Sequence, residues 1–280
     1  MRFLSLLLAF IQKSSFLVFL GIPATCYALC LHYQIAMPYP IYWLIGSSAW
    51  LVYLLDHFID AGTSTLSVDR YDFIAKRKKI FAGIGAAIVL LNAFLVFVYF
   101  DKTLLIFGMV IGLLVLVHQF INTSVRKAGG NALFKESFVA LIVTLVFGFP
   151  VLYNFSVFQG HLVPLFFLLL INLGNVWLFA HIEIEEDRKN NYPSLALSLG
   201  KKKSKQMLKQ LYFLLLIGLA GQWNFEQDKA LLIALAAMVI TLQVILLKTD
   251  YFSKNNLYRF WGDLIYLYPF MALLIQNKLA

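Results

Sequence analysis

The chain has 280 residues, of which 61% are hydrophobic and 13% are charged, and its formal net charge is +9. An ordinary soluble domain carries about 25% charged residues, so this composition excludes a soluble globular protein. Apolar runs of about 18 or more residues recur along the chain, which is typical of a polytopic α-helical membrane protein. The runs are continuous, as in FAGIGAAIVLLNAFLVFVYF, and lack the alternation of a membrane β-barrel.

The apolar pattern predicts an all-α membrane protein with about nine transmembrane helices around a central cavity. We expect one domain that covers residues 1–280. The predicted spans cover residues 14–33, 38–60, 80–100, 103–122, 134–155, 161–183, 207–223, 229–247 and 258–276.

Lysine and arginine gather in the connections after the second, fourth, sixth and eighth predicted spans. Because cytoplasmic loops carry an excess of these residues, we expect those connections and the N-terminus to lie in the cytoplasm. We therefore expect an integral protein of a bacterial inner (cytoplasmic) membrane. The densest basic run, KKKSK at residues 201–205, also suits contact with anionic membrane lipid.

Two acidic pairs end apolar runs on the predicted cytoplasmic side. Asp56 and Asp60 end the second span, and Glu183 and Asp187 end the sixth. Residues four apart share one helix face, so each pair brings two carboxylates together. An acid at the centre of a transmembrane helix costs about 2.5 to 3.5 kcal/mol, so acids beside lipid indicate function. The pairs predict Mg²⁺ sites, because Mg²⁺ binds one or two carboxylates and completes its shell with water and substrate phosphate.

The acidic pairs also divide the chain into two halves of similar plan, residues 1–132 and 133–280. Each half offers carboxylates and then cations, and weak internal repeats are common in membrane proteins. We expect the halves to form one cavity with an apolar interior and a mouth that binds a metal–diphosphate complex. The cations assigned to the diphosphate are Arg126, Lys127, Arg70 and Lys135.

These motifs resemble those of the UbiA superfamily of intramembrane prenyltransferases. That family has nine transmembrane helices and two aspartate-rich motifs, which follow helices two and six. Its first motif reads Asn-x-x-x-Asp-x-x-x-Asp, and this chain has Val52 at the Asn position, followed by Asp56 and Asp60. Its second motif is similar to EIEEDRKNNYPSLALSLG, in which Glu183 and Asp187 form the pair.

Other features of the family are matched in part. The basic pair that ends the family's fourth helix is present as Arg126 and Lys127, although Asn122 stands at the position of the usual Tyr. The segment ALFKESFVALIVTLVFG is similar to the opening of the fifth helix. The usual Arg-x-x-Arg-Pro after the first motif is replaced by DRYDFIAKRKK. The resemblance covers most of the chain, and the second motif is its most specific part.

The resemblance implies a prenyltransferase, which is a transferase of alkyl or aryl groups other than methyl. The expected reaction is Mg²⁺-dependent transfer of a prenyl group from an isoprenyl diphosphate to a lipophilic acceptor, such as an aromatic quinone precursor. Asp56, Asp60, Glu183 and Asp187 are then the catalytic carboxylates and the metal ligands. Mg²⁺ would neutralise the pyrophosphate leaving group, and aromatic faces would stabilise the allylic cation.

Two other functions stay open at this point. A catalytically silent UbiA-like partner protein is one, because Val52 replaces the family Asn. A cation-coupled membrane transporter is the other, although transporter acids lie near the membrane midplane and these lie at one interface. His57 and His181 lie within the acidic segments as metal ligands, bases or packing residues. We expect no nucleic-acid partner.

Overall fold

The computed structural model describes residues 10–63, 69–99, 101–128, 133–153, 162–190, 192–225 and 229–279. The side chains of residues 60–71 and 122–134 lie outside the described part. Throughout the described residues every regular element is a helix and no strand occurs. The prediction of an all-α fold is therefore confirmed.

Every predicted span coincides with a long helix or with helices joined end to end. The long helices are α2 Phe16–His32, α3 Tyr39–Thr63, α5 Lys78–Tyr99, α6 Lys102–Ala128, α7 Leu133–Phe147, α10 Leu162–Ile182, α13 Lys201–Gln222, α14 Lys229–Leu247 and α17 Tyr268–Leu279. By length and composition α5, α6, α10 and α14 can cross a membrane, and α2 is a shorter apolar helix. The fold is that of a polytopic membrane protein, and the count of nine crossings stays a prediction.

The last predicted span is broken in its middle. It consists of α16 Leu257–Leu264, the 3₁₀ turn η2 Ile265–Leu267 and then α17. Pro269 explains the break, because proline has no N–H and its ring crowds the carbonyl one turn earlier. At the break, the hydroxyl of Thr25 in α2 donates a hydrogen bond to the carbonyl of Tyr266, at 2.6 Å.

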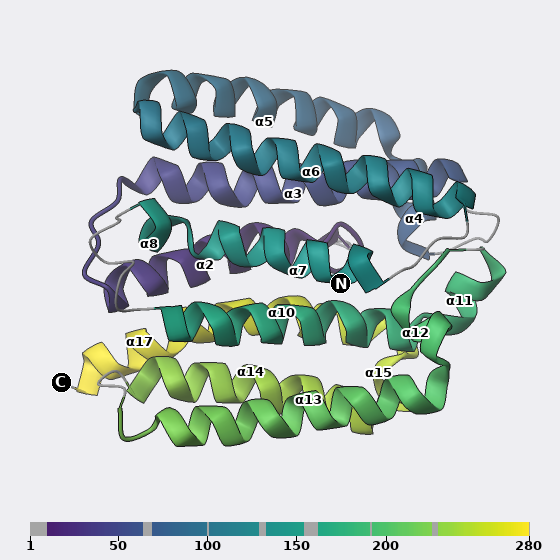
Figure 1. Cartoon of the computed structure of the whole chain (residues 1–280). Helices are drawn as coiled ribbons and strands as arrows, with labels where there is room; N and C mark the ends of the chain where they lie inside the picture. The colour runs from purple at the N-terminus through teal and green to yellow at the C-terminus, as the bar shows by residue number, and fades with distance from the viewer. Residues whose placement is uncertain are drawn as a thin grey trace, which may run out of the picture.

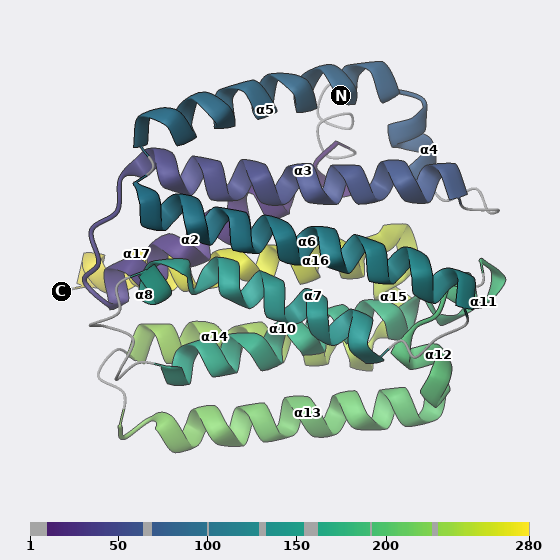
Figure 2. The same cartoon turned by 45° about the horizontal axis from the view of Figure 1, so that its top comes forward.

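The helices lie side by side in one bundle (Figures 1 and 2). Packing contacts run in a closed series from α3 to α2, α17, α14, α13, α10 and α7 and back to α2, with α5 on α3 and α6 on α7 at the outside. Because α2 contacts α3, α7, α16 and α17, the first predicted span lies inside the bundle. The central cavity and the two repeat halves stay predictions.

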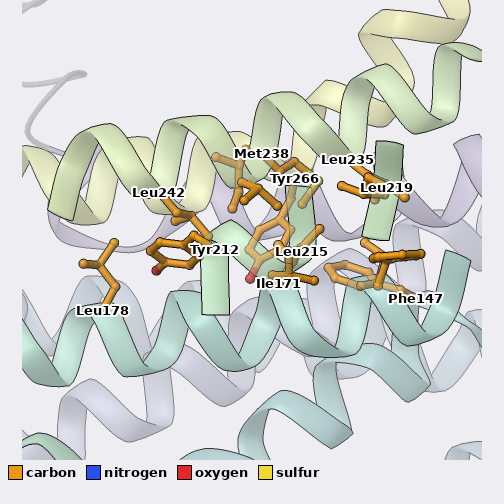
Figure 3. Close-up of a cluster of buried hydrophobic side chains, with 14 of the residues drawn as sticks. Phe147, Ile171, Leu178, Tyr212, Leu215, Leu219, Leu235, Met238, Leu242 and Tyr266 are labelled. Carbon is orange, nitrogen blue, oxygen red and sulfur yellow. The ribbon is translucent and has the colours of Figure 1, made fainter. Parts of the chain in front are cut away.

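The largest apolar core lies where α10, α13 and α14 meet (Figure 3). Phe147 of α7 and Tyr266 of η2 reach the same cluster. Gly174 allows α10 and α13 to approach closely, because a Cβ there would lie 2.7 Å from the ring of Tyr212. The hydroxyl of Tyr212 donates to the Gly174 carbonyl at 2.9 Å, so the buried phenol is satisfied at this contact.

Short elements gather at one end of the bundle, on the right in Figures 1 and 2. They are α4 Asp69–Ala75, α11 Ile184–Lys189, α12 Leu195–Leu199, α15 Thr249–Phe252 and the 3₁₀ turn η1 Lys254–Asn256. Helices α3 and α10 finish at this end, and α16 begins there. This end therefore holds the segments that carry both acidic pairs.

Candidate active site

The first acidic pair lies on the last turns of α3. Asp56 is half-buried, and the side chain of Asp60 lies outside the described part. The neighbouring His57 is buried, and its Nε2 lies 3.1 Å from the Ser15 hydroxyl, just before α2. The end of α3 is thus fastened to the start of α2, and Asp56 keeps partial access to solvent.

The second pair lies where α10 passes into α11. Helix α10 ends at Ile182, Glu183 occupies a turn, and α11 begins at Ile184. The Asp187 backbone N–H donates to the Glu183 carbonyl at 2.8 Å, which keeps the two residues one helical turn apart. The predicted spacing of this pair therefore survives a change of helix direction.

Glu183 is held by two residues of α16 that the sequence analysis did not assign to the site. Its Oε1 accepts hydrogen bonds from the hydroxyl of Tyr258, at 2.5 Å, and from Nε of Arg259, at 2.7 Å. Nη2 of Arg259 donates to the same oxygen. The guanidinium also lies over the ring of Phe179 in α10, 5.2 Å from its centroid, in a cation–π contact.

Asp187 has a different environment, although it is only four residues away. Burial and the nearby charge of Glu183 raise the pKa of Asp187 to about 7, against the opposing effects of a Ser194 hydrogen bond and the charge of Lys135. Lys135, one of the cations assigned to the diphosphate, therefore lies close enough to influence this carboxylate. The structure brings Lys135, Glu183 and Asp187 into one neighbourhood.

Helix α12 connects Asp187 to α7. Ser194 is the N-cap of α12 and accepts from the Leu197 N–H at 3.3 Å. The next N–H, that of Leu195, donates to Oε1 of Glu136 in α7 at 2.9 Å. Glu136 is buried, and Ser194 also bonds Asp187, so α7, α11 and α12 are joined by one polar network.

The two acidic ends are linked through α16. Tyr53 lies on α3, three residues before Asp56, and its phenol feels the charges of Asp263 and Arg259 of α16 as well as that of Asp56. Arg259 in turn bonds Glu183. Arg259 of α16 therefore bonds Glu183 directly and acts electrostatically on Tyr53, one turn before Asp56.

Four predicted site residues cannot be placed by their side chains. Asp60, Arg70, Arg126 and Lys127 have side chains outside the described part, although their backbones lie in α3, α4 and α6. Their roles stay predictions.

Mg²⁺ can be tested against the donors present. Among the described side chains, no group of three or more His, Cys, Asp or Glu lies close enough to hold a metal ion. That set does not include Asp60. The donor chemistry still fits Mg²⁺, because burial and the charge of Glu183 both raise the pKa of Asp187, and a divalent cation would offset the repulsion between the two carboxylates.

The comparisons with known proteins identify the family. Residues 78–267 match the UbiA prenyltransferase family, which is more than half of the chain. The chain belongs to this family. Searches for similar curated proteins and for similar solved structures found no match.

Membership of the UbiA family makes the chain an integral membrane protein of a prenyltransferase family and confirms the resemblance. The matched segment runs from α5 to η2, so it includes Glu183, Asp187 and Arg259. Asp56 and Asp60 precede it.

One feature of the sequence indicates that residues of α16 belong to the site. Asp263 is a single acid within the last predicted span, where an ionisable group is costly and points to a functional site. Arg259 lies four residues earlier, so the two share a helix face. As one of the basic residues that follow the eighth predicted span, Arg259 otherwise indicates only the topology.

Proposed function

We propose that this UbiA-family protein transfers a prenyl group from an isoprenyl diphosphate to a lipophilic acceptor, and that the reaction depends on Mg²⁺. The acceptor class that we propose is an aromatic quinone precursor, and the location is a bacterial cytoplasmic membrane with the N-terminus and both acidic ends inside. One observation carries the proposal. Helix α3 carries the first acidic pair, helix α10 leads directly into the second, and both helices finish at the same end of the bundle (Figures 1 and 2).

The residue roles follow from charge and position. Asp56, Asp60, Glu183 and Asp187 would hold Mg²⁺, which when bound neutralises the pyrophosphate leaving group. Lys135, which lies in the electrostatic neighbourhood of Asp187, would bind a diphosphate oxygen.

Three further cations are proposed for the diphosphate, namely Arg70, Arg126 and Lys127. Arg70 belongs to α4 at the same end of the bundle as α11 and α12. An arginine suits this role, because its planar guanidinium binds phosphate with two parallel hydrogen bonds.

Besides groups that bind the metal and the diphosphate, the reaction requires surroundings without water, and the apolar bundle supplies them. Loss of pyrophosphate leaves an allylic cation on the prenyl chain, and water would capture that cation before an acceptor does. An interior of apolar and aromatic side chains excludes water, and aromatic faces stabilise a cation by about 0.5 to 2 kcal/mol each. A lipophilic acceptor would reach this interior from the membrane.

The test measures pyrophosphate release by the full chain in detergent or nanodiscs. The substrates are Mg²⁺, a panel of isoprenyl diphosphates and a membrane lipid extract, with the prenylated product identified by mass. Asp56→Asn and Asp187→Asn should each lower turnover at least about 100-fold, because metal stabilisation of the leaving group contributes several kcal/mol. Glu185→Gln is the matched control, because Glu185 is exposed and pairs with Arg188 at 2.9 Å.

The same assay separates the other two functions. Unchanged turnover in both Asp variants would contradict the assigned roles. Turnover that is absent in the natural chain and appears with Val52→Asn would favour a catalytically silent partner protein. Cation flux without pyrophosphate release would favour a transporter.

A further inference from the structure

The ion pair between Glu183 and Arg259 poses a problem for metal binding. Three donors from Tyr258 and Arg259 converge on Oε1 of Glu183. A carboxylate oxygen offers about two lone pairs, so Oε1 has no capacity left for a cation, and the positive charge of the guanidinium beside it opposes a cation on Oε2 as well. Mg²⁺ also demands near-octahedral geometry at about 2.0–2.1 Å, which leaves no room for the guanidinium on the same oxygen.

Arg259 is a resident partner of Glu183 and differs from an ordinary surface cation. Its side chain is 19% exposed and that of Glu183 is 11% exposed. The neighbouring Arg188–Glu185 pair is 59% and 60% exposed, so it is open to water and screened by salt.

Packing fixes the position of Arg259 from its other side. Its guanidinium lies over the rings of Phe179 and Tyr258, at 5.2 and 5.8 Å from the centroids. Gly262, one turn later, lets α16 approach α10, because a Cβ there would lie 2.6 Å from the Phe179 ring. The close approach of the two helices thus holds the guanidinium at Glu183.

Arg259 also has a second anionic neighbour on its own helix. Asp263 lies four residues later, on the same face of α16, and is buried. Both residues act electrostatically on Tyr53 of α3, beside the first acidic pair. A guanidinium that leaves Glu183 therefore stays in a region of negative charge.

We propose that Arg259 is a displaceable counter-ion, which neutralises Glu183 in the metal-free protein and is displaced from it by Mg²⁺. Arg259 is in this view a positioning residue, which sets the metal affinity by competing for a ligand. The proposal rests on the metal role of Glu183 in the proposed function. It makes α16 the third helix of the site, together with α3 and α10.

The test measures the Mg²⁺ dissociation constant of the full chain in nanodiscs by calorimetry, without substrate. Arg259→Gln should lower this constant by at least about fivefold, which is a typical coupling factor between linked sites. Arg259→Lys keeps the charge but loses the planar guanidinium that donates twice to Glu183, so its dissociation constant should lie between those of the natural chain and Arg259→Gln. A residue with only a structural role would not tighten metal binding when it is removed.

Two controls separate competition from general charge. Arg188→Gln removes a cation from the same segment and should leave the constant unchanged within about twofold. In a Glu183→Gln background, Arg259→Gln should have no further effect on Mg²⁺ affinity, because the contested oxygen is then no longer a carboxylate. Tyr258→Phe removes one donor from the same oxygen and should lower the Mg²⁺ dissociation constant by a smaller factor. This variant keeps the test available if Arg259→Gln does not fold.

Two results would overturn the proposal. Unchanged or weaker Mg²⁺ binding in folded Arg259→Gln, with tight binding in the natural chain, would show that the pair is a permanent structural contact. That result would leave the proposed function intact. Absence of any Mg²⁺ binding by both the natural chain and folded Arg259→Gln would overturn this inference, whereas the proposed function fails only if pyrophosphate release does not depend on Mg²⁺.

Discussion

Helices α5 and α6 and helices α10 and α14 are all long and apolar enough to cross a membrane, yet they take different places. Only 11% and 6% of the residues in the spans of α5 and α6 are buried, against 56% and 50% in α10 and α14. The first pair therefore turns most of its side chains outward, and the second pair forms the core. Apolar content decides that a segment enters the membrane, whereas packing partners decide whether it is buried.

The polar contacts of the site lie at α10, one helix of the buried pair. Glu183 directly follows α10, and the α16 residues Tyr258 and Arg259 bind it from the side. Asn175 of α10 donates to the Gly262 carbonyl and to the Tyr266 hydroxyl, both at 3.0 Å. Substitutions along α10 and α16 should therefore disturb the site, and comparable substitutions along α5 should not.

The largest difference is expected for buried and exposed leucines. Leu178 of α10 is fully buried in the core, whereas Leu90 of α5 is 73% exposed (Figure 3 shows Leu178). Leu178→Ala should lower the free energy of unfolding by about 2 kcal/mol or more, because it leaves a cavity between packed helices. Leu90→Ala should change it by less than about 0.5 kcal/mol, because lipid fills the space. Denaturant unfolding in mixed micelles measures both, and equal effects would refute the assignment of core and periphery.

Two glycines give a second, smaller contrast. A Cβ at Gly262 would lie 2.6 Å from the Phe179 ring and 2.8 Å from Oδ1 of Asn175, whereas nothing lies within 4 Å at Gly83 of α5. Gly262→Ala should therefore cost about 1–3 kcal/mol of stability, since the overpacked α16 must move away from α10. Gly83→Ala should be neutral or slightly stabilising, because alanine is the better helix former. A stable Gly262→Ala protein with unchanged Mg²⁺ affinity would show that the close approach does not position Arg259.

The smallest effect concerns pH, and it again contrasts the two regions. Burial and the charge of Glu183 raise the pKa of Asp187 to about 7, so this carboxyl is mostly protonated below that pH. Because Mg²⁺ binds the ionised form, its affinity should fall about tenfold from pH 8 to pH 6. The free energy of unfolding of the metal-free protein should instead increase as pH falls. The contribution of this raised pKa is fully present below the unfolded value of about 3.9 and is lost as pH rises through about 7.

Asp101, in the connection between α5 and α6, provides the matched control. Hydrogen bonds from the Leu104 N–H, at 2.8 Å, and the Tyr153 hydroxyl, at 2.5 Å, lower its pKa. Its stabilising contribution is therefore present above the unfolded pKa of about 3.9 and is lost as pH falls through the lowered value. Calorimetric titrations between pH 6 and 8 should show that Asp187→Asn flattens the pH dependence of Mg²⁺ binding and that Asp101→Asn leaves it unchanged.

Much of the fold could be predicted from the sequence, because lipid leaves the backbone few choices. A long apolar segment in a membrane must satisfy its own hydrogen bonds, so each run became a helix close to its predicted range. The sequence does not predict the break in the last span, although Pro269 lies there, because a proline allows a kink as well as a break. The pair Glu183 and Asp187 is visible in the sequence because residues four apart share a helix face, and its role as a metal site stays a prediction.

The sequence by itself determined the helical membrane class, the acidic pairs and the family, because these depend on composition and on spacing within one segment. Only the tertiary structure decided that Arg259 pairs with Glu183 and that Glu136 bonds the Leu195 N–H, next to the Ser194 that bonds Asp187. The Arg259–Glu183 hydrogen bond joins residues 76 positions apart along the chain, and the Leu195–Glu136 hydrogen bond joins residues 59 positions apart. Such pairings arise when helices pack at close range, and no local pattern of residue types encodes them.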